Sequence, residues 1–302
     1  MYSLQNLPDS IDSTYRVECE LGSGGGGIVY KAWHSRLNKY VVIKADKQGI
    51  AADPDSCRNE ADALKNVKCM YIPQVFDYLE KDNRSYTIIE YVEGVSFDKL
   101  LKENRSFERA DLIRWYLQLA SALKSIHERG ICHRDIKPSN IMLTTEGDAY
   151  LIDFNSALVG DNTTRTMSRS PGYASPEQNE LFAKLESGRL KFETDNDQTV
   201  VEVDEAECVT ELSDNDSMLQ NPTKPVLQRG IDWKLSDVYS LGAAMYHLLT
   251  GKRPLLPADD TVIFANAGYS EDILRYVIDR SLKRDPNLRF PSADELVQIL
   301  SG

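Results

Sequence analysis

Residues 133–140 read HRDIKPSN, and residues 153–155 read DFN. This stretch combines two carboxylates, a lysine and an asparagine at short intervals, namely Asp135, Lys137, Asn140 and Asp153. One acid can orient an acceptor hydroxyl, and the cation can offset charge that develops on a transferred group. The amide and the second acid offer the hard oxygen atoms that hold magnesium against phosphates. Together these residue types predict a site for phosphoryl transfer.

A glycine-rich stretch, LGSGGGGIVYKA at 21–32, supplies a second feature of such a site. Gly22, Gly24 and Gly27 follow GxGxxG spacing, and without Cβ atoms their backbone can lie directly over phosphates. The same letters also suit a flexible hairpin turn, so this stretch alone leaves both interpretations open. Further along the chain, the strand-like VVIK ends in Lys44.

With these parts in this order, the sequence resembles the protein kinase family, in particular the serine/threonine kinases of bacteria. The resemblance implies an α+β, two-lobed protein kinase-like fold with a small antiparallel-sheet N-lobe and a larger helical C-lobe. It divides the chain into an N-terminal arm at 1–14, an N-lobe at 15–92 and a C-lobe at 93–302.

The resemblance implies ATP as the phosphate donor, held with Mg²⁺ or with Mn²⁺ in its place. Asp135 is then the expected catalytic base, and Lys137 is expected to stabilise the transferring phosphoryl group. Asn140 and Asp153 are the expected metal ligands. A lysine at position 137 is typical of serine/threonine specificity in this family.

The expected ATP-binding residues surround the adenine and the phosphates. They are Leu21, Gly22, Ser23, Gly24, Gly25, Gly26, Gly27, Val29, Val42, Lys44, Glu90, Val92 and Met142. Lys44 corresponds to the phosphate-binding lysine, and Glu60 corresponds to its ion-pair partner. Taken singly, both would be ordinary surface charges. Ile89 corresponds to the gatekeeper behind the adenine site.

Two positions depart from the family pattern. Gly26 stands where relatives usually carry a larger residue, so we expect a mobile loop whose ordering costs more entropy on nucleotide binding. Asn155 replaces the usual glycine after Asp-Phe, and asparagine tolerates positive φ better than other residues do. We expect activity to survive this change, with less freedom for the segment to flip. Loss of activity is the competing outcome and leaves a pseudokinase open.

Residues 153–177 read DFNSALVGDNTTRTMSRSPGYASPE and resemble the activation and substrate-docking segment of kinases. The resemblance places Ser170 beside the catalytic aspartate. It also pairs Arg289 with Glu177. It implies that Asp237 stabilises residues 133–140, which are called the catalytic loop below.

Four hydroxyls in this segment are candidate phosphorylation sites, namely Thr163, Thr164, Thr166 and Ser168. A phosphate on any of them could pair with Arg134 and order the segment through charge-assisted hydrogen bonds. An ordinary polar loop explains each single hydroxyl at least as well.

The periodicity of the N-terminal third predicts a sheet. Segments of this part alternate like short strands, at 15–21, 27–33, 40–45, 74–80 and 85–92. One helical pattern interrupts them at 55–67.

From about residue 97 the periodicity is helical. One predicted helix carries an apolar face made of Leu112, Trp115, Tyr116, Leu119, Leu123 and Ile126. Gly130 follows this helix as its expected C-cap. Residues 238–251 are apolar on nearly all sides, which predicts a central buried helix. Near the end, SADELVQIL predicts a closing helix with Ser292 as its N-cap.

The net charge of −12 argues against nucleic acid as the main partner. Residues 193–216 hold ten acids and no Lys or Arg, and without these ten acids the net charge would be −2. The acidity therefore belongs to an insertion at about 181–230. A solvated, disordered surface insertion is one interpretation. Recruitment of basic protein substrates beside the substrate groove is the other.

The five cysteines are scattered and odd in number, which favours reduced thiols over a disulfide framework or a zinc site. No signal peptide and no apolar run long enough for a membrane span are recognisable. We therefore predict a cytoplasmic serine/threonine protein kinase that acts on protein substrates, with autophosphorylation of the activation segment as a further expectation. A nucleotide-binding pseudokinase scaffold and a small-molecule kinase are the alternatives.

Overall fold

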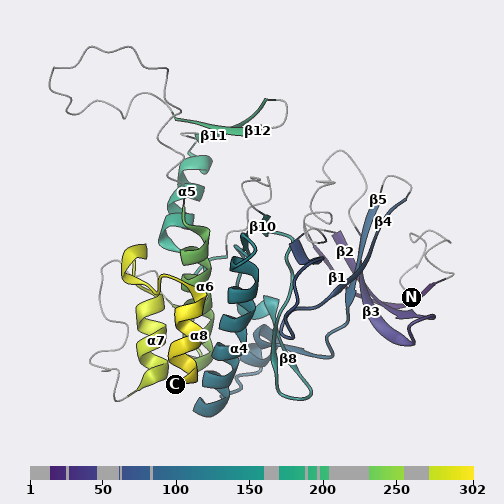
Figure 1. Ribbon diagram of the computed structural model, residues 1–302, viewed down its shortest axis with the longest axis horizontal. Helices are drawn as coiled ribbons and strands as arrows, with labels where there is room; N and C mark the ends of the chain where they lie inside the picture. The colour runs from purple at the N-terminus through teal and green to yellow at the C-terminus, as the bar shows by residue number, and fades with distance from the viewer. Residues whose placement is uncertain are drawn as a thin grey trace.

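A computed structural model of the chain describes residues 14–24, 27–45, 61, 63–81, 84–159, 170–187, 190–195, 198–203, 231–254 and 272–302. The elements form a small sheet-rich lobe, at the right of Figure 1, and a larger helical lobe. The predicted α+β, two-lobed fold is confirmed.

The small lobe is built on one antiparallel sheet with the strand order β1-β2-β3-β5-β4. Its strands are β1 (Tyr15–Gly24), β2 (Gly27–His34), β3 (Lys39–Ala45), β4 (Val75–Lys81) and β5 (Arg84–Glu90). The predicted strand segments are confirmed, because alternate side chains of these strands face inward. On β2, Tyr30 and Ala32 join the small core, whereas Lys31 and Trp33 lie on the other face.

The helix predicted at 55–67 falls mostly outside the described residues. Ala61, Ala63 and Leu64 are described and helical. Ala63 and Leu64 pack into the core of the large lobe, not into the small core under the sheet. These described residues, which lie between β3 and β4 in the chain, therefore belong to the core of the large lobe.

Helix α4 (Arg109–His127) buries all six residues of the predicted apolar face. The predicted cap at Gly130 is wrong, because the helix ends at His127 with Glu128 as its C-cap. The Glu128 amide donates to the carbonyls of Ile126 and Lys124, so the last turn closes without a left-handed residue. Gly130 has a φ of 71° and instead turns the chain into β7 (Ile131–Cys132).

Helix α6 (Trp233–Thr250) runs through the large lobe, and eleven of its residues are buried. It begins at Asp232, whose carboxylate accepts from the amides of Lys234 and Leu235, and it ends at left-handed Gly251. Helix α7 (Ile273–Ser281) packs against it, whereas α8 (Ala293–Ser301) packs against α4. The predicted N-cap Ser292 is confirmed, since its hydroxyl accepts from the amide of Glu295.

The remaining elements lie around the junction of the lobes and in the insertion. They are β6 (Gly94–Ser96), α3 (Phe97–Lys102), η1 (Pro138–Asn140), β8 (Ile141–Thr144), β9 (Ala149–Leu151), β10 (Leu158–Val159), α5 (Pro176–Glu186), β11 (Leu190–Asp195), β12 (Gln198–Val203) and η4 (Pro286–Leu288). Gly94 opens the large lobe, where a Cβ atom would lie 2.2 Å from the carbonyl oxygen of Leu143. Only glycine permits this close approach of β6 to β8.

The insertion begins with the end of α5, which continues to Glu186. Within it, β11 and β12 form a two-stranded antiparallel hairpin. Residues 204–230 lie outside the described part of the chain. Within that part, no helix is both long and apolar enough to cross a membrane.

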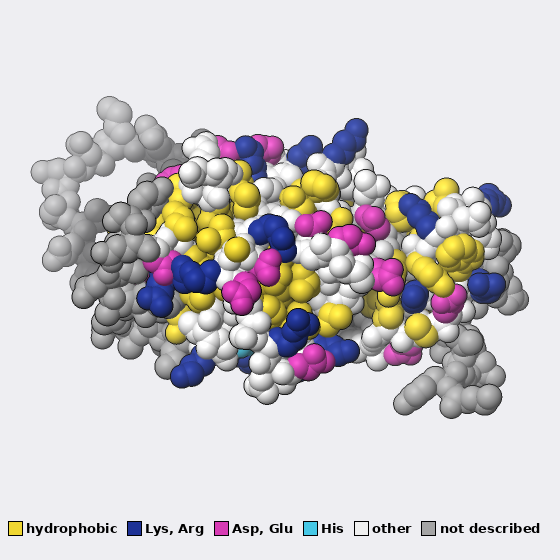
Figure 2. Space-filling view, turned by 90° about the horizontal axis from the view of Figure 1, so that it is seen from below, with side chains coloured by type: hydrophobic (Ala, Val, Ile, Leu, Met, Phe, Trp, Pro, Cys, Tyr) yellow, Lys and Arg dark blue, Asp and Glu magenta, His cyan; other side chains and the backbone are white. Residues whose placement is uncertain are grey.

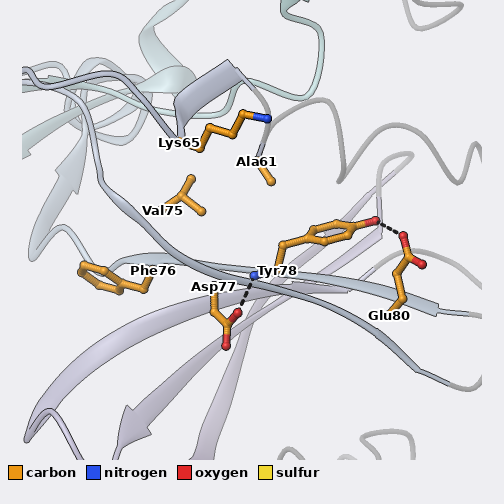
Figure 3. A pocket seen from close by; sticks show the side chains of 7 residues that line it. All are labelled: Ala61, Lys65, Val75, Phe76, Asp77, Tyr78 and Glu80. Atoms are coloured by element: carbon orange, nitrogen blue, oxygen red, sulfur yellow. Dashed lines mark hydrogen bonds between the residues drawn. The ribbon is translucent and has the colours of Figure 1, made fainter.

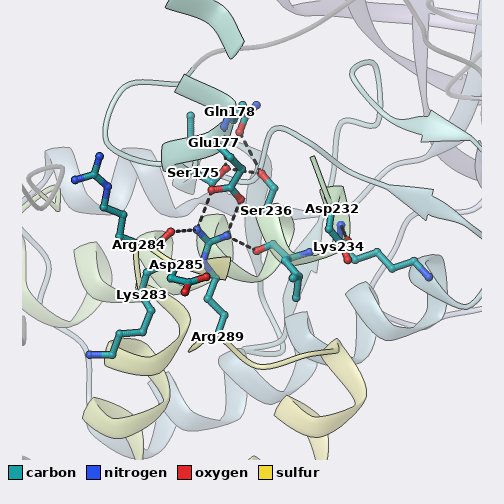
Figure 4. Close-up of polar contacts among 12 residues, drawn as sticks. Ser175, Glu177, Gln178, Asp232, Lys234, Ser236, Lys283, Arg284, Asp285 and Arg289 are labelled. Atoms are coloured by element: carbon teal, nitrogen blue, oxygen red, sulfur yellow. Dashed lines mark hydrogen bonds and ion pairs between the residues drawn. The ribbon is translucent and has the colours of Figure 1, made fainter. Parts of the chain in front are cut away.

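An ion pair between the buried Arg289 and the partly buried Glu177 fastens the end of the docking segment to the large lobe. Both terminal nitrogens of Arg289 donate to the carboxylate of Glu177, at 2.6 and 2.8 Å, which confirms the predicted pair (Figure 4). Arg289 also donates to the carbonyls of Lys283, Arg284 and Leu235. Its guanidinium lies over the ring of Tyr239, so its positive charge is surrounded by acceptors.

Arg289→Ala should lower the free energy of unfolding by about 3–5 kcal/mol, because it removes a buried guanidinium and leaves the partly buried carboxylate of Glu177 and three backbone carbonyls without their donor. Chemical denaturation measures this change. As the control, Lys102→Ala removes an exposed helical ion pair with Asp98 and should cost no more than about 0.5 kcal/mol. A cost below about 1 kcal/mol for Arg289→Ala would contradict the role assigned to this pair.

Candidate active site

Lys44 and Asp153 form an ion pair that joins the two lobes. Lys44 lies on β3 opposite Val29 of β2, and its Nζ lies 3.0 Å from Oδ1 of Asp153 in the large lobe. Burial by itself would raise the pKa of Asp153, but the Lys44 ammonium outweighs burial and holds this pKa below its usual range. Asp153 is therefore ionised at neutral pH. The structure brings these two predicted residues together.

Asp135 lies among three polar partners. Its Oδ2 accepts from Lys137 Nζ at 2.7 Å and from Asn140 Nδ2 at 3.2 Å. Its Oδ1 accepts from the hydroxyl of Ser170 at 2.7 Å, and Lys137 also donates to this hydroxyl at 3.1 Å. The predicted contact between Ser170 and the aspartate is confirmed. Asp135 therefore already accepts a hydrogen bond from a hydroxyl beside a cation.

Asp237, at the start of α6, holds the catalytic loop from behind. Its fully buried carboxylate accepts from the backbone amides of His133 and Arg134, each at 2.8 Å, which confirms the predicted brace. Arg134 adopts a φ of 63°, which is unfavourable for a residue with a Cβ. The two hydrogen bonds to Asp237 stabilise this turn, which immediately precedes Asp135.

The catalytic loop is also joined to the segment that carries Asp153. The amide of Ile152 donates to the Asn140 carbonyl at 2.9 Å, and the His133 ring contacts the Ile152 carbonyl at 3.2 Å. The rings of His133 and Phe154 pack edge to face with centroids 4.6 Å apart, and both residues are fully buried. Asp135, Asn140 and Asp153 are thereby held by one connected framework.

The donor atoms at this point suit a hard divalent cation. Nδ2 of Asn140 donates to the Asp135 backbone carbonyl at 2.8 Å, so the amide oxygen, which accepts one long hydrogen bond of 3.4 Å from the Ser139 hydroxyl, is the atom that can face a metal. Asp153 uses Oδ1 for Lys44, and within the described residues its Oδ2 forms no hydrogen bond. A carboxylate oxygen and an amide oxygen are the ligands that Mg²⁺ prefers.

The expected ATP-binding residues that are described lie on β1, β2, β3, β5 and β8, except Val92, which follows β5. Gly22, Ser23 and Gly24 of β1 pair with Val29, Ile28 and Gly27 of β2. Val42 lies opposite the buried Ile89 in the β3–β5 ladder, and Met142 lies opposite Ser96 on β8. The amide of Glu90 donates to the Gln74 carbonyl, so this amide is not available to adenine. Leu21 is half exposed.

Several predicted residues lie outside the described part of the chain. They are Gly25, Gly26, Glu60, Thr163, Thr164, Thr166 and Ser168. The predictions on loop mobility, on the ion pair of Glu60 and on phosphorylation therefore stay predictions.

The interpretation of Asn155 needs correction. Positive φ angles occur at Arg134 and Asp153, whereas Asn155 is not among the described residues with this conformation. Tolerance of positive φ therefore does not explain the asparagine. Its Oδ1 is buried and forms no hydrogen bond within the described residues. An unpaired buried acceptor carries a desolvation cost, so within the described residues this oxygen adds no stability through hydrogen bonding.

A buried network behind the catalytic loop was not predicted. The side-chain Nε2 of Gln178 donates to the carbonyl of Arg134 at 3.0 Å. The backbone N–H of Gln178 donates to the hydroxyl of Ser175. The hydroxyls of Ser175 and Ser236 lie 2.9 Å apart, next to Gln178, as Figure 4 shows. This network connects the docking segment, α6 and the catalytic loop. Only the helix-capping position of Ser175 before Pro-Glu could have been recognised in the sequence.

His127, Cys132 and Asp237 also converge, with donor atoms within 4.8 Å of one another. In the sequence, the scattering of the cysteines favours reduced thiols over a zinc site. Asp237 already accepts from two amides and lies 2.9 Å from His127 Nε2. Burial, reinforced by the charge of Asp237, raises the pKa of the Cys132 thiol, which disfavours the thiolate that metals bind. The cluster is better explained as packing behind the catalytic loop.

Two surface features lie away from this site. A groove of about 600 Å³ is lined by Ala61 and Lys65 and by Val75, Phe76, Asp77, Tyr78 and Glu80 from β4 (Figure 3). None of these residues is an expected site residue. On the face shown in Figure 2, acidic and basic side chains are interspersed and do not gather by sign.

Comparison with known proteins agrees with this geometry. Residues 15–186 match the protein kinase domain, and the chain belongs to the protein kinase family. It is 29% identical to a probable serine/threonine-protein kinase of Clostridium acetobutylicum and 27% identical to one of Streptomyces coelicolor. These alignments cover 97% and 96% of the chain but only 40% of each relative. A probable serine/threonine-protein kinase of Clostridium perfringens is 34% identical over 52% of the chain and 24% of that protein. The chain thus spans less than half the length of these relatives.

Gln178→Leu should lower the free energy of unfolding by about 1–3 kcal/mol, because it removes a buried hydrogen bond to the Arg134 carbonyl. It should also reduce kcat for phosphoryl transfer, because it loosens the turn before Asp135. Chemical denaturation and initial rates measure the two effects. Gln298→Leu, at an exposed position of α8, is the matched control and should change unfolding by less than about 0.5 kcal/mol. Equal behaviour of the two variants would contradict the assigned role.

Proposed function

We propose that the chain is a serine/threonine protein kinase that transfers the γ-phosphate of ATP to hydroxyl groups of proteins. The observation that carries this proposal is the contact of Asp135 with a hydroxyl and a lysine. Ser170 Oγ donates to Asp135 at 2.7 Å, and Lys137 reaches both groups. A substrate hydroxyl in the same relation to Asp135 would be oriented for attack on the γ-phosphate.

Each polar residue then has a role in transfer. Asp135 accepts the hydrogen bond, and later the proton, of the attacking hydroxyl. Lys137 offsets the charge that develops on the transferring phosphoryl group, and Lys44 binds the phosphates from the small lobe. Because Lys44 also pairs with Asp153, its position depends on the approach of the two lobes.

Asn140 and Asp153 would hold Mg²⁺, with Mn²⁺ as the alternative. When bound, the metal neutralises phosphate charge and aligns the β- and γ-phosphates. The chain itself holds the side chains of Asn140 and Asp153 in position to bind the metal. Asn140 is oriented by its bonds to Asp135, and Asp153 is kept ionised by Lys44.

Protein Ser/Thr specificity is supported by Lys137, by Ser170 and by the names of the bacterial relatives. A cytoplasmic location fits the proposed use of ATP. It also fits the free thiols of Cys19, Cys69 and Cys132.

Two other functions were open from the sequence. A pseudokinase scaffold would not require Asp135 to be arranged with a lysine and a hydroxyl. A small-molecule kinase would not require the docking segment to be fastened by Arg289 and Glu177. Both features favour a protein kinase.

Asp135→Asn should lower the rate of phosphate transfer from radiolabelled ATP to protein acceptors by about 10²–10⁴-fold, because the hydroxyl loses its base. Lys44→Met should raise KM for ATP and lower kcat. Removal of divalent metal with EDTA should abolish transfer, and added Mg²⁺ should restore it. Asp279→Asn, an acid on α7 away from the site, is the control and should behave as wild type.

Whether label enters proteins, small molecules or neither distinguishes a protein kinase, a small-molecule kinase and a pseudokinase. Label in small-molecule acceptors but in no protein would support a small-molecule kinase. Nucleotide binding without any transfer in the presence of Mg²⁺ or Mn²⁺ would support a pseudokinase.

Autophosphorylation of Thr163, Thr164, Thr166 or Ser168 is proposed on sequence grounds. Arg134 is the proposed partner of the phosphate, and its Nε now donates to the Ser156 carbonyl at 2.6 Å. Burial lowers the pKa of Arg134 to about 10, so its guanidinium remains charged at neutral pH.

Phosphopeptide mapping after incubation with ATP should find phosphate on this segment in the wild type and none in Asp135→Asn. Treatment of the wild type with a phosphatase should reverse any gain in activity. Identical unmodified segments in both proteins would remove the proposal of autophosphorylation and leave that of kinase activity intact.

A further inference from the structure

The docking segment makes a tight turn beside the catalytic aspartate. The amides of Tyr173 and Ala174 both donate to the Ser170 carbonyl, at 2.9 and 3.0 Å. From this turn the Ser170 hydroxyl reaches Asp135, while the Tyr173 hydroxyl lies 2.6 Å from Nδ1 of His247 on α6. A peptide whose hydroxyl approaches Asp135 must therefore pass close to this turn.

Arg253, just beyond the end of α6, lies against the same turn. Its guanidinium carbon is 5.8 Å from the centroid of the Tyr173 ring, within the range of a cation–π contact. A Cβ atom on Gly172 would lie 3.7 Å from Arg253 Cβ and 3.9 Å from its Cδ. The stem of Arg253 is thus held along the turn while the residue itself is exposed.

The guanidinium of Arg253 has no acidic partner at ion-pair distance within the part of the chain that the structure describes, which leaves out residues 255–271. The acid that acts on Tyr173 and His247 is Asp98 of α3, and its carboxylate already pairs with Lys102 at 2.6 Å. Lys252, the neighbour of Arg253, is also exposed. The described surface beside the turn therefore carries excess positive charge.

We propose that Arg253, supported by Lys252, forms a substrate subsite that selects an acidic side chain of the protein substrate within a few residues of the phosphorylated hydroxyl. This proposal rests on the proposed kinase function and names its substrate class. A guanidinium binds a carboxylate through two parallel hydrogen bonds, and here its stem is already ordered against Tyr173. The subsite favours acidic substrates, whereas the acidic insertion had suggested basic ones.

The test uses the 302-residue chain and synthetic peptides with one serine acceptor in an otherwise neutral background. A single Glu is placed in turn at each of the four positions on either side of the serine, and a matched series carries Lys. At one or two positions Glu should lower KM about tenfold relative to the neutral peptide, as expected for a hydrogen bond to a charged group. Lys at the same positions should raise KM.

Variants then assign the preference to Arg253. Arg253→Gln should remove the advantage of Glu, and Arg253→Glu should reverse it in favour of Lys. Arg253→Lys keeps the charge and should keep part of the preference. Arg16→Gln, which removes an exposed cation on β1, is the control and should leave the preference of the wild type unchanged. Circular dichroism shows whether each variant is folded.

The outcomes that overturn the subsite are distinct. Equal use of Glu and Lys peptides by the wild type, or a preference for Lys, would contradict it. An equal loss with every peptide in folded Arg253→Gln would show that Arg253 only braces Tyr173.

A binding measurement separates failure of the subsite from failure of the kinase function. Fluorescent peptides with alanine in place of serine require no catalysis. The wild type should still bind the Glu peptide about tenfold more tightly than the Lys peptide, and Arg253→Gln should not. This result without phosphate transfer would refute the kinase function and keep the anionic subsite, whereas equal binding would refute the subsite whatever the activity.

Discussion

The arrangement of the site depends on one buried carboxylate. Asp237 is fully buried, and it accepts the two successive amides of His133 and Arg134 while contacting His127. A buried charge is tolerated only when its lone pairs are filled, and here the donors are the backbone of the catalytic loop itself. The same bonds hold Arg134 at a φ of 63°. Asp237 of the stable helix α6 thus holds the strained turn immediately before Asp135. This turn sets the direction of the Asp135 side chain, and that direction decides whether Asp135 can orient an acceptor hydroxyl.

The two lobes differ in how they are held. The sheet has its own small core of residues such as Val41, Ile43 and Ile88, whereas Ala63 and Leu64, between β3 and β4, belong to the large core. Hydrophobic burial thus fixes these two residues to the large lobe, and Val75 of β4 also packs against that core. The ion pair between Lys44 and Asp153 crosses this boundary at 3.0 Å. Because that pair keeps Asp153 ionised, closure of the lobes and readiness to bind a cation are linked by the same contact.

The sequence predicted those contacts of the site that depend on a few residues at fixed spacing. The contacts of Ser170 with Asp135, of Arg289 with Glu177 and of Asp237 with the loop were all predictable from residues matched to a family pattern. The network of Gln178 and Ser236 was not predictable, because residues with an amide or a hydroxyl usually lie on the surface, and only the tertiary structure shows that these two are buried together.

The end of α4 was predicted wrongly for a related reason. A glycine after a helix suggests a left-handed cap, but the chain first closed a turn at Glu128 and used Gly130 to enter β7. At Asn155 a rule about backbone φ was applied to the wrong residue, since Asp153 takes the positive angle.

The charge of the whole chain is a poor guide to the charge that a substrate meets. Ten of the acids that produce the net charge of −12 lie at 193–216, and screening limits the reach of exposed charges to about 8 Å at physiological ionic strength. A side chain that approaches Asp135 responds instead to groups within that distance of the docking turn. There Asp98 is already paired with Lys102, and the guanidinium of Arg253 is held against Tyr173. An acidic protein can therefore present a cationic substrate surface, because a few ordered charges at the site act at contact distance, whereas the net charge sums acids from the whole chain.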